Sequence, residues 1–195
     1  MIVVDIETTG MEPEKNSLLS IGALDFSNPK NTFYGECRAD EGASVSNIAL
    51  KINGFSREQI HDPEKPTSKE LLQNFLKWMK PIKDKTIAGD NIWFDTGFLQ
   101  ENFRRIGVKY PFKGESIELH EISPLLAGLP WSLDAALYMS GIPPRTNAHN
   151  ALDDAELTAE VISRLMNGKN LLKRFRKYPV PDIFIEYVNI RNRKK

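Results

Sequence analysis

The chain has 195 residues, of which 41% are hydrophobic and 27% charged, with 26 basic and 26 acidic side chains. This composition predicts an ordinary one-domain globular protein and excludes a largely disordered chain, and no apolar run is long enough to span a bilayer. Met1 leads into strand-like residues rather than a signal peptide, and the single Cys37 cannot build a disulfide framework, so we expect a cytoplasmic protein.

Charge is distributed unevenly between residues 1–168, the body, and residues 169–195, the basic C-terminal extension. The extension contains nine Lys or Arg and two acidic residues, so its net charge is +7 and that of the body is −7. Such an extension attracts the phosphates of an anionic polymer, although a solvated terminus has the same composition. The apolar residues 183–185 predict that the extension packs on the body.

Three strands are predicted at the start of the chain. The first begins at Ile2, and runs of β-forming residues predict two more at residues 18–25 and 32–38. A turn-forming segment at residues 27–31 joins the last two. We therefore expect an antiparallel meander.

Helices and short strands alternate in the rest of the body. The predicted elements are short helical segments over 43–60, a helix opened by a capping box at Thr67 and Glu70, a strand at 86–89, a helix at 92–106, a strand at 117–119, a helix opened by Ser132, and a helix at 151–166. A strand followed by a helix and another strand indicates a crossover connection. We expect a mixed α/β sheet with flanking helices.

Two acidic residues inside the first strand are the strongest functional signal. Asp5 and Glu7 are two residues apart, so their side chains leave the same face of the strand, about 7 Å apart at the Cα atoms. Apolar neighbours suggest a central strand, where unpaired carboxylates are costly unless a cation neutralises them. The pair predicts a metal site, although charges at the end of an exposed edge strand give the same pattern.

Two further acidic residues and a histidine lie where helices begin. Asp95 is in the first turn of the helix at 92–106, on the face that carries its apolar side chains, so its carboxylate is expected to point inward. His149 precedes the helix at 151–166 and Asp154 lies in its first turn, so both can reach one site. Taken singly, Asp95 could complement the helix dipole, and His149 could be a surface or capping residue.

Three motifs together resemble those of the DEDD (DnaQ-like) superfamily of 3′→5′ exonucleases, in its histidine subtype, DEDDh, which includes the proofreading subunit of bacterial DNA polymerase III. They are Asp5-Ile6-Glu7-Thr8-Thr9-Gly10, the segment 91–99 with Asp95, and the segment from His149 to Asp154. Ser132-Leu133-Asp134 also matches a helix start common between the second and third motifs. The resemblance covers residues 1 to about 168 and implies an exonuclease domain with a ribonuclease H-like fold.

The resemblance also implies roles for individual residues. Two divalent ions, Mg²⁺ or Mn²⁺, suit a set of hard oxygen donors, and a histidine would take the proton from the attacking water. The implied metal ligands are Asp5, Glu7, Asp95 and Asp154, the implied general base is His149, and the implied nucleotide-binding residues are Thr8, Thr9, Gly10 and Met11. Met11 could instead pack in the core, and Phe55 and Trp93 could either stack on bases or be structural.

The implied function is hydrolysis of phosphodiester bonds at the 3′ ends of single-stranded nucleic acid, with release of nucleoside 5′-monophosphates. The Thr8-Thr9-Gly10 form favours DNA. An RNA-trimming exoribonuclease and a catalytically inactive nucleic-acid-binding or polymerase-associated module are the alternatives, and a proofreading role would need a DNA polymerase subunit in trans. Asp90 and Asn53 stand where family members often have His, and both flank the implied metal ligands.

Overall fold

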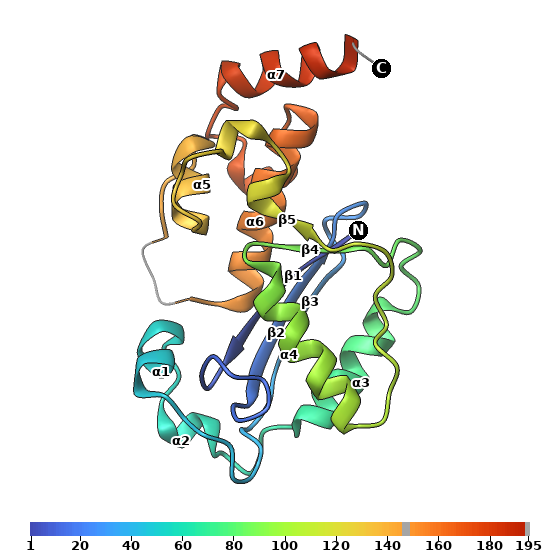
Figure 1. The fold of residues 1–195 in the computed structure, drawn as a ribbon, viewed down its shortest axis with the longest axis vertical. Helices are drawn as coiled ribbons and strands as arrows, with labels where there is room; N and C mark the ends of the chain where they lie inside the picture. Colours follow the sequence, from blue (N-terminus) through green and yellow to red (C-terminus); the bar gives the residue numbers. More distant parts are fainter. Residues whose placement is uncertain (146–148, 194–195) are drawn as a thin grey trace.

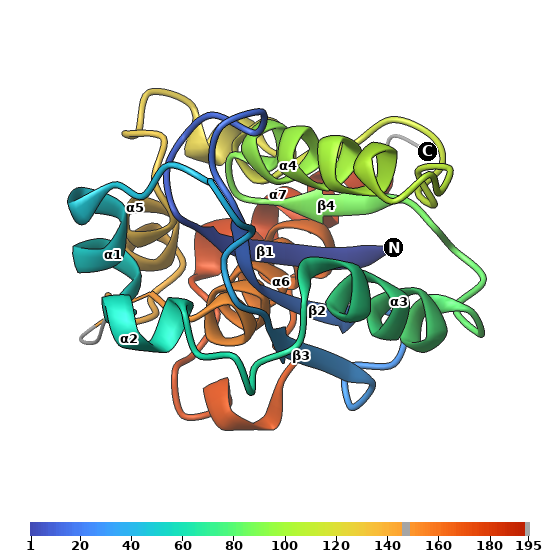
Figure 2. The ribbon, with the colours of Figure 1, turned by 90° about the horizontal axis from the view of Figure 1, so that it is seen from below.

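The computed structural model describes residues 1–145 and 149–193. In these residues, five strands form one mixed sheet with helices on both faces (Figures 1 and 2). The strands are β1 (Ile2–Thr8), β2 (Leu18–Asp25), β3 (Thr32–Glu36), β4 (Ile87–Gly89) and β5 (Ile117–Glu118). The α-helices are α1 (Asn47–Asn53), α2 (Arg57–Ile60), α3 (Ser68–Met79), α4 (Ile92–Arg105), α5 (Leu133–Met139), α6 (Ala151–Asn167) and α7 (Asp182–Arg193).

The strands lie in the order β3-β2-β1-β4-β5, so the strand that carries Asp5 and Glu7 is central, as predicted. Strands β1, β2 and β3 form the predicted antiparallel meander, and β4 and β5 are added in parallel. β4 is short and pairs only with Ile2 and Val3 of β1. The carboxyl half of β1 is therefore open to side chains on that edge.

Successive residues of β1 face two different cores. Ile2, Val4 and Ile6 pack in the core formed with α3 and α4, whereas Val3 packs in the core formed with α5, α6 and the extension. Because side chains alternate along a strand, Asp5 and Glu7 leave the sheet on the same face as Val3. Both carboxylates therefore leave β1 on the face that packs against α6, and Figure 2 shows the arrangement of β1 and α6.

The start of α6 lies directly against β2 at Gly22. A Cβ atom at Gly22 would lie 2.1 Å from the backbone carbonyl carbon of Ala151, the first residue of α6. Gly22 is also the residue of β2 that pairs with Asp5. The absence of a side chain at position 22 thus lets the first turn of α6, with Asp154, approach the strand that carries Asp5.

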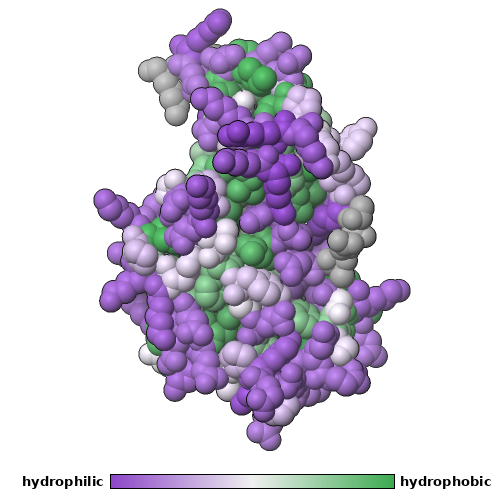
Figure 3. All heavy atoms as spheres, turned by 180° about the vertical axis from the view of Figure 1, so that it is seen from behind, coloured by the Kyte–Doolittle hydropathy of each residue, from purple (hydrophilic) through white to green (hydrophobic). Residues whose placement is uncertain are grey.

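The basic C-terminal extension contains a 3₁₀ turn (Lys173–Phe175) and α7, a helix that the sequence did not predict. Phe175 and Phe184 are buried in the core that contains α6, whereas Ile183 and Ile185 are exposed, because neighbouring residues of a helix point in different directions. From behind, hydrophilic side chains cover most of the surface, including the end formed by the extension (Figure 3). The division into an exonuclease domain and an extension stays a prediction.

Most predicted elements are present, and the differences are at their ends. β3 ends at Glu36 rather than at residue 38, because the N–H of Arg38 donates to the carbonyl oxygen of Pro66 instead of continuing the sheet. The predicted capping box at Thr67 with Glu70 is formed, and Ser56 with Gln59 forms another. Within the described ranges, no helix has the length and apolar character needed to cross a membrane.

Candidate active site

A cleft of about 330 Å³ opens at the carboxyl end of β1. All four carboxylates and the histidine that the sequence predicts as functional line it: Asp5, Glu7, Asp95, Asp154 and His149. They come from β1, from the first turns of α4 and α6, and from the residues just before α6. Three segments that are far apart in the sequence therefore contribute to one site.

The tightest group in the cleft consists of Glu7, His149 and Asp154. Each of these residues offers one ligand atom, and the three atoms lie within 4.8 Å of one another. The His149 Nδ1 and Asp154 Oδ2 atoms are 3.7 Å apart. Carboxylates and an imidazole at this spacing can hold a divalent cation, and Asp5 and Asp95 add two more hard oxygen donors to the same cleft.

Asp95 is held in place by a hydrogen bond from β1 and by the unusual start of α4. The open edge of β1 lets the Ile6 N–H donate a hydrogen bond of 3.0 Å to Asp95 Oδ1. At the start of α4, Asn91 has a left-handed backbone (φ 52°) and makes no side-chain cap. Instead Glu118 of β5 accepts from the N–H groups of Asn91 (3.3 Å) and Ile92 (2.9 Å), which satisfies the helix terminus and holds its first turn against the sheet.

The histidine and Asp154 are held from both sides of the cleft. Asn150 is the N-cap of α6, and its side-chain oxygen accepts from two backbone N–H groups of the first turn, at 3.2 Å each. The backbone N–H of His149 donates to the carbonyl oxygen of Ile52 in α1 (3.2 Å). The neighbouring Asn53 donates from Nδ2 to the carbonyl oxygen of Thr8 (3.0 Å), so α1 connects β1 to the residues before α6.

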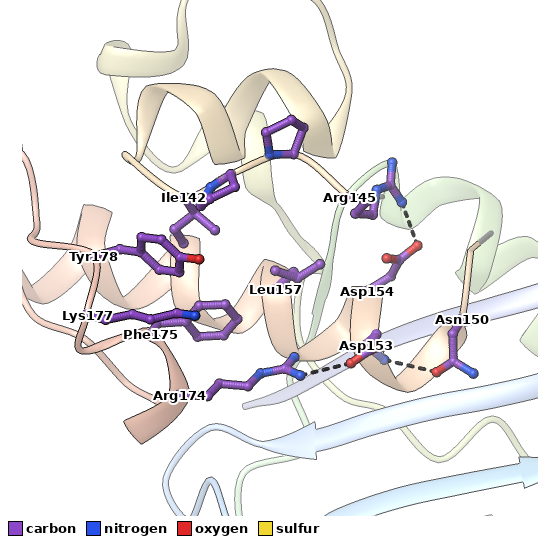
Figure 4. Close-up of a pocket in the computed structure, with 12 residues that line it drawn as sticks. Ile142, Arg145, Asn150, Asp153, Asp154, Leu157, Arg174, Phe175, Lys177 and Tyr178 are labelled. Atoms are coloured by element: carbon purple, nitrogen blue, oxygen red, sulfur yellow. Dashed lines mark hydrogen bonds and ion pairs between the residues drawn. The ribbon is translucent and has the colours of Figure 1, made fainter. Parts of the chain in front are cut away.

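Arg145 is a functional-site residue that the sequence did not single out. Its Nη1 donates to Asp154 Oδ2 at 2.6 Å, and its Nε and Nη2 donate to the two carboxylate oxygens of Asp134, at 3.0 and 3.3 Å. Figure 4 shows Arg145 and Asp154 meeting at the edge of a second pocket. Arg145 lies in a loop after two prolines, where neither periodicity nor a motif marks a functional residue.

The carboxylates of the cleft lack full compensation. Burial, followed by repulsion from the neighbouring carboxylates, raises the pKa of Asp5 well above its usual value. Burial also raises the pKa of Glu7 to about 8, and the charge of Asp154 adds to this rise. Burial raises the pKa of Asp154 and Asp95 as well, although Arg145 opposes the rise at Asp154. A cluster of carboxyl groups that ionises readily only when a positive charge is nearby fits a site for divalent cations.

The predicted nucleotide-binding residues do not all reach the cleft. Thr8, Gly10 and Met11 line it, and Met11 is 73% exposed, so the alternative that Met11 packs in the core is wrong. Thr9 is fully buried and does not line the cleft. Its hydroxyl donates to the carbonyl oxygen of Ser44 (2.7 Å) and accepts from a backbone N–H, which makes Thr9 a support of the loop.

The aromatic residues considered as base-stacking candidates also differ in position. Phe55 borders a small neighbouring pocket that it shares with Glu7 and His149. Trp93 is exposed but does not line the cleft. At the two positions where family members often have His, this chain has Asn53 and Asp90. Asn53 donates to the carbonyl oxygen of Thr8, and Asp90 Oδ1 lies 3.2 Å from Nε2 of His120.

Known proteins resemble this chain along most of its length. The family model described as exonuclease matches residues 2–162. DNA polymerase III subunit epsilon of Rickettsia typhi is 30% identical over 86% of this chain and 74% of its own length. Ribonuclease T of Marinobacter nauticus is 29% identical over 92% of this chain and 87% of its own length. A PolC-type DNA polymerase III of Thermotoga maritima is 26% identical, but the chain spans only 12% of that protein.

A solved nuclease structure has a fold similar to that of this chain. The nuclease domain of 3′hExo, a DEDDh family member bound to rAMP, superposes with a TM-score of 0.69 over 88% of this chain and 94% of that chain, at 21% identity. This likeness confirms the predicted ribonuclease H-like arrangement, and the family match confirms the predicted exonuclease function. The chain thus belongs to the exonuclease family of the DEDD superfamily and is a 3′→5′ exonuclease.

Proposed function

We propose that this chain removes nucleoside 5′-monophosphates one at a time from the 3′ ends of single-stranded nucleic acid, with DNA preferred. The observation that carries the proposal is the meeting of Asp5, Glu7, Asp95, Asp154 and His149 in one cleft. A module that only bound nucleic acid would gain nothing from four mutually repelling carboxylates beside a polyanion. Their cost in stability is explained by a catalytic role.

The four carboxylates fit a pair of divalent ions. All are hard oxygen donors, which suit Mg²⁺ or Mn²⁺ better than zinc. Asp5 would serve both ions, Glu7 and Asp154 would serve the first, and Asp95 would serve the second. When bound, such a pair supplies an activated water and stabilises the leaving 3′ oxygen.

His149 is suited to accept the proton of the attacking water. Burial, and then the positive charge of Arg145, lower the pKa of His149 below its usual value, so its imidazole is neutral near pH 7 and can take up a proton. Its backbone is fixed to α1 by the bond to Ile52, so the ring is held at the cleft. A positioned general base of this kind contributes about 10²–10⁴-fold to the rate.

The terminal nucleotide would lie against the loop after β1. Met11 offers an exposed apolar side chain for the last base, and Thr8 and Gly10 line the cleft beside it. The hydroxyl of Thr8 donates to the carbonyl oxygen of Gly10 (2.6 Å), which stabilises this turn. Thr9 supports the same turn from the interior rather than by contacting substrate.

A preference for DNA rests on the Thr8-Thr9-Gly10 form and on the likeness to the epsilon subunit. The similar likeness to a ribonuclease T keeps RNA trimming as the second candidate. The epsilon relative also supports a polymerase subunit as a partner in trans. A cytoplasmic location stays a prediction.

An end-labelled ladder assay tests the proposal. Single-stranded DNA and RNA of the same sequence, labelled at the 5′ end, are incubated with Mg²⁺, with Mn²⁺ or with EDTA. We expect stepwise shortening from the 3′ end only with metal, and faster on DNA. Faster shortening of RNA would favour the exoribonuclease, and binding without cleavage under every metal condition would favour the inactive module.

Replacement of His149 tests the assigned base. We expect His149→Ala to lose about 10²–10⁴-fold in kcat while it keeps its thermal midpoint. His61→Ala is the matched control, because His61 is exposed and does not line the cleft. Full activity of His149→Ala would remove this residue from the mechanism.

A further inference from the structure

We propose that the indole of Trp131 is a stacking platform for an unpaired nucleobase of the substrate. This inference rests on the proposed function, because it assumes a single-stranded nucleic-acid substrate. It adds a base-binding subsite to the cleft, in the segment just before α5.

Trp131 combines large exposure with a place in the catalytic cleft. Its side chain is 64% exposed, and it lines the same cleft as the four carboxylates and Met11. It directly precedes Ser132, whose hydroxyl caps α5, so the backbone beside the indole is fixed by the start of a helix. An indole as exposed as this one contributes little to folding, because it buries little apolar area.

The indole is also held in one orientation from behind. The rings of Trp131 and His120 are stacked, with centroids 5.4 Å apart and an interplanar angle of 12°. His120 itself is buried in the 3₁₀ turn after β5, and its Nε2 lies 3.2 Å from Asp90 Oδ1. With one face of the indole covered by a fixed ring, the opposite face is available to a flat ligand.

A nucleobase is the ligand that this surface fits. Every base has an apolar π-face, and stacking on protein aromatics is the usual way that single strands are bound without sequence preference. The indole is flat, apolar and uncharged, so it binds the face of a base rather than the phosphates of the backbone. A base paired in a duplex cannot expose its face in this way, so the same contact favours single strands.

Substitutions at Trp131 and at Trp93, which is also exposed, test whether base binding depends on Trp131 in particular. Binding of a short fluorescently labelled oligodeoxythymidine is measured with EDTA, which prevents cleavage, and KM and kcat are measured with Mg²⁺. We expect Trp131→Ala to weaken binding and raise KM roughly 5- to 150-fold with kcat little changed. Trp131→Phe should recover most of the affinity. Trp93→Ala, a change at an indole 54% exposed outside the cleft, should behave as wild type.

An abasic oligonucleotide of the same length distinguishes base stacking from attraction to phosphates. Oligodeoxythymidine should quench tryptophan fluorescence in wild type and in Trp93→Phe but not in Trp131→Phe, and the abasic strand should quench none of them. Equal affinity of Trp131→Ala and Trp93→Ala for the oligonucleotide would overturn the inference. Failure of the proposed function is a different result, because wild type would then not shorten the strand under any metal condition, whatever the affinity of Trp131→Ala.

His120 acts in this scheme as a positioning residue. His120→Ala should raise KM without changing kcat, because the indole loses its backing, and His120→Phe should restore KM because a phenyl ring can stack on the same face. A lower thermal midpoint with an unchanged KM in His120→Ala would show a purely structural role and contradict this step.

Discussion

The two ends of α6 both bury charged side chains, but only one end compensates them. In the carboxyl half, Arg164 and Glu160 are fully buried and pair through Nε and Oε1 at 3.0 Å. Arg164 also donates to the carbonyl oxygens of Ser140 (2.6 Å) and Tyr178 (2.9 Å), and Glu160 Oε2 accepts from two backbone N–H groups of the extension, at 2.8 Å each. This charge network joins α5, α6 and the extension.

At the amino end of the same helix, Asp154 faces Asp5, Glu7 and Asp95 in the cleft. Arg145 pairs with Asp154 alone among the four carboxylates that meet there, and burial raises the pKa of each carboxyl. The compensated network stabilises the fold, whereas the carboxylate cluster is costly until a cation binds. The contrast shows that a buried charge indicates a binding site only when the surrounding protein leaves it unsatisfied.

The largest expected effect is the loss of activity on neutralising the cluster. Asp5→Asn should lower kcat by about 10³-fold or more, since loss of even one preorganised electrostatic contact costs on the order of 10²–10³-fold. Its thermal midpoint in EDTA should not fall, because the change removes a repelled charge. Asp153→Asn, on the exposed side of α6, is the control and should stay active. A clear loss of stability in Asp5→Asn would contradict the contrast between the two ends.

The opposite pattern is expected at the compensated end. Arg164→Met should lower the free energy of unfolding by about 3–5 kcal/mol, because Glu160 would be left buried without its partner. Urea denaturation measures this change, and kcat of the folded fraction should be unchanged. The double variant Glu160→Gln with Arg164→Met should recover part of the loss. A double variant that is less stable than Arg164→Met would show that an unpaired charge is not the cause.

Metal and pH should act together at the cleft. Burial raises the pKa of Glu7 from 4.5 to about 8. Between these two pH values, in EDTA, the Glu7 carboxyl therefore keeps a proton in the folded protein and releases it in the unfolded chain. The contribution of Glu7 to the free energy of unfolding is then present below about pH 4.5 and falls as the pH rises through about 8. Mg²⁺ at about 100 times its Kd should add about 2.7 kcal/mol.

Thermal midpoints at several pH values, with EDTA and with Mg²⁺, measure this linkage. Glu7→Gln supplies the reference, since it cannot titrate at this position. The decline of stability with pH should be steeper in wild type than in Glu7→Gln in EDTA, and the gain from Mg²⁺ should grow with pH in wild type. Parallel pH profiles of the two proteins in EDTA would show that the Glu7 carboxyl is already compensated.

The smallest effect is expected for an exposed cation close to α6. Arg174 pairs with Asp153 (2.9 Å) and Glu156 (2.7 Å) at the edge of the second pocket (Figure 4). Because this guanidinium is half-exposed and screened, Arg174→Gln should change the free energy of unfolding by less than about 1 kcal/mol. Chemical denaturation at low and high salt measures it. A loss of stability as large as that of Arg164→Met would mean that the different exposure of Arg164 and Arg174 does not explain their contributions to the free energy of unfolding.

Local patterns were sufficient for much of the fold and for the main members of the cleft. Strand alternation placed Asp5 and Glu7 on one face, and the predicted starts of two helices placed Asp95 and Asp154 in first turns. The helix α7 was not predicted, because the consecutive apolar residues 183–185 show no helical periodicity and its burial depends on α6. Arg145 and Trp131 were missed because both lie in irregular segments, where sequence spacing carries no information on spatial neighbours.

The sequence by itself determined the family, the order of strands and helices, and the acidic residues and histidine of the cleft, because these depend on short-range periodicity and on motifs of fixed spacing. Only the tertiary structure decided which of these residues meet. In the folded chain Thr9 lies in the interior, Glu118 of β5 caps α4, and Trp131 stacks on His120. These contacts join segments that are distant along the chain, and they form only when the sheet and its helices pack together.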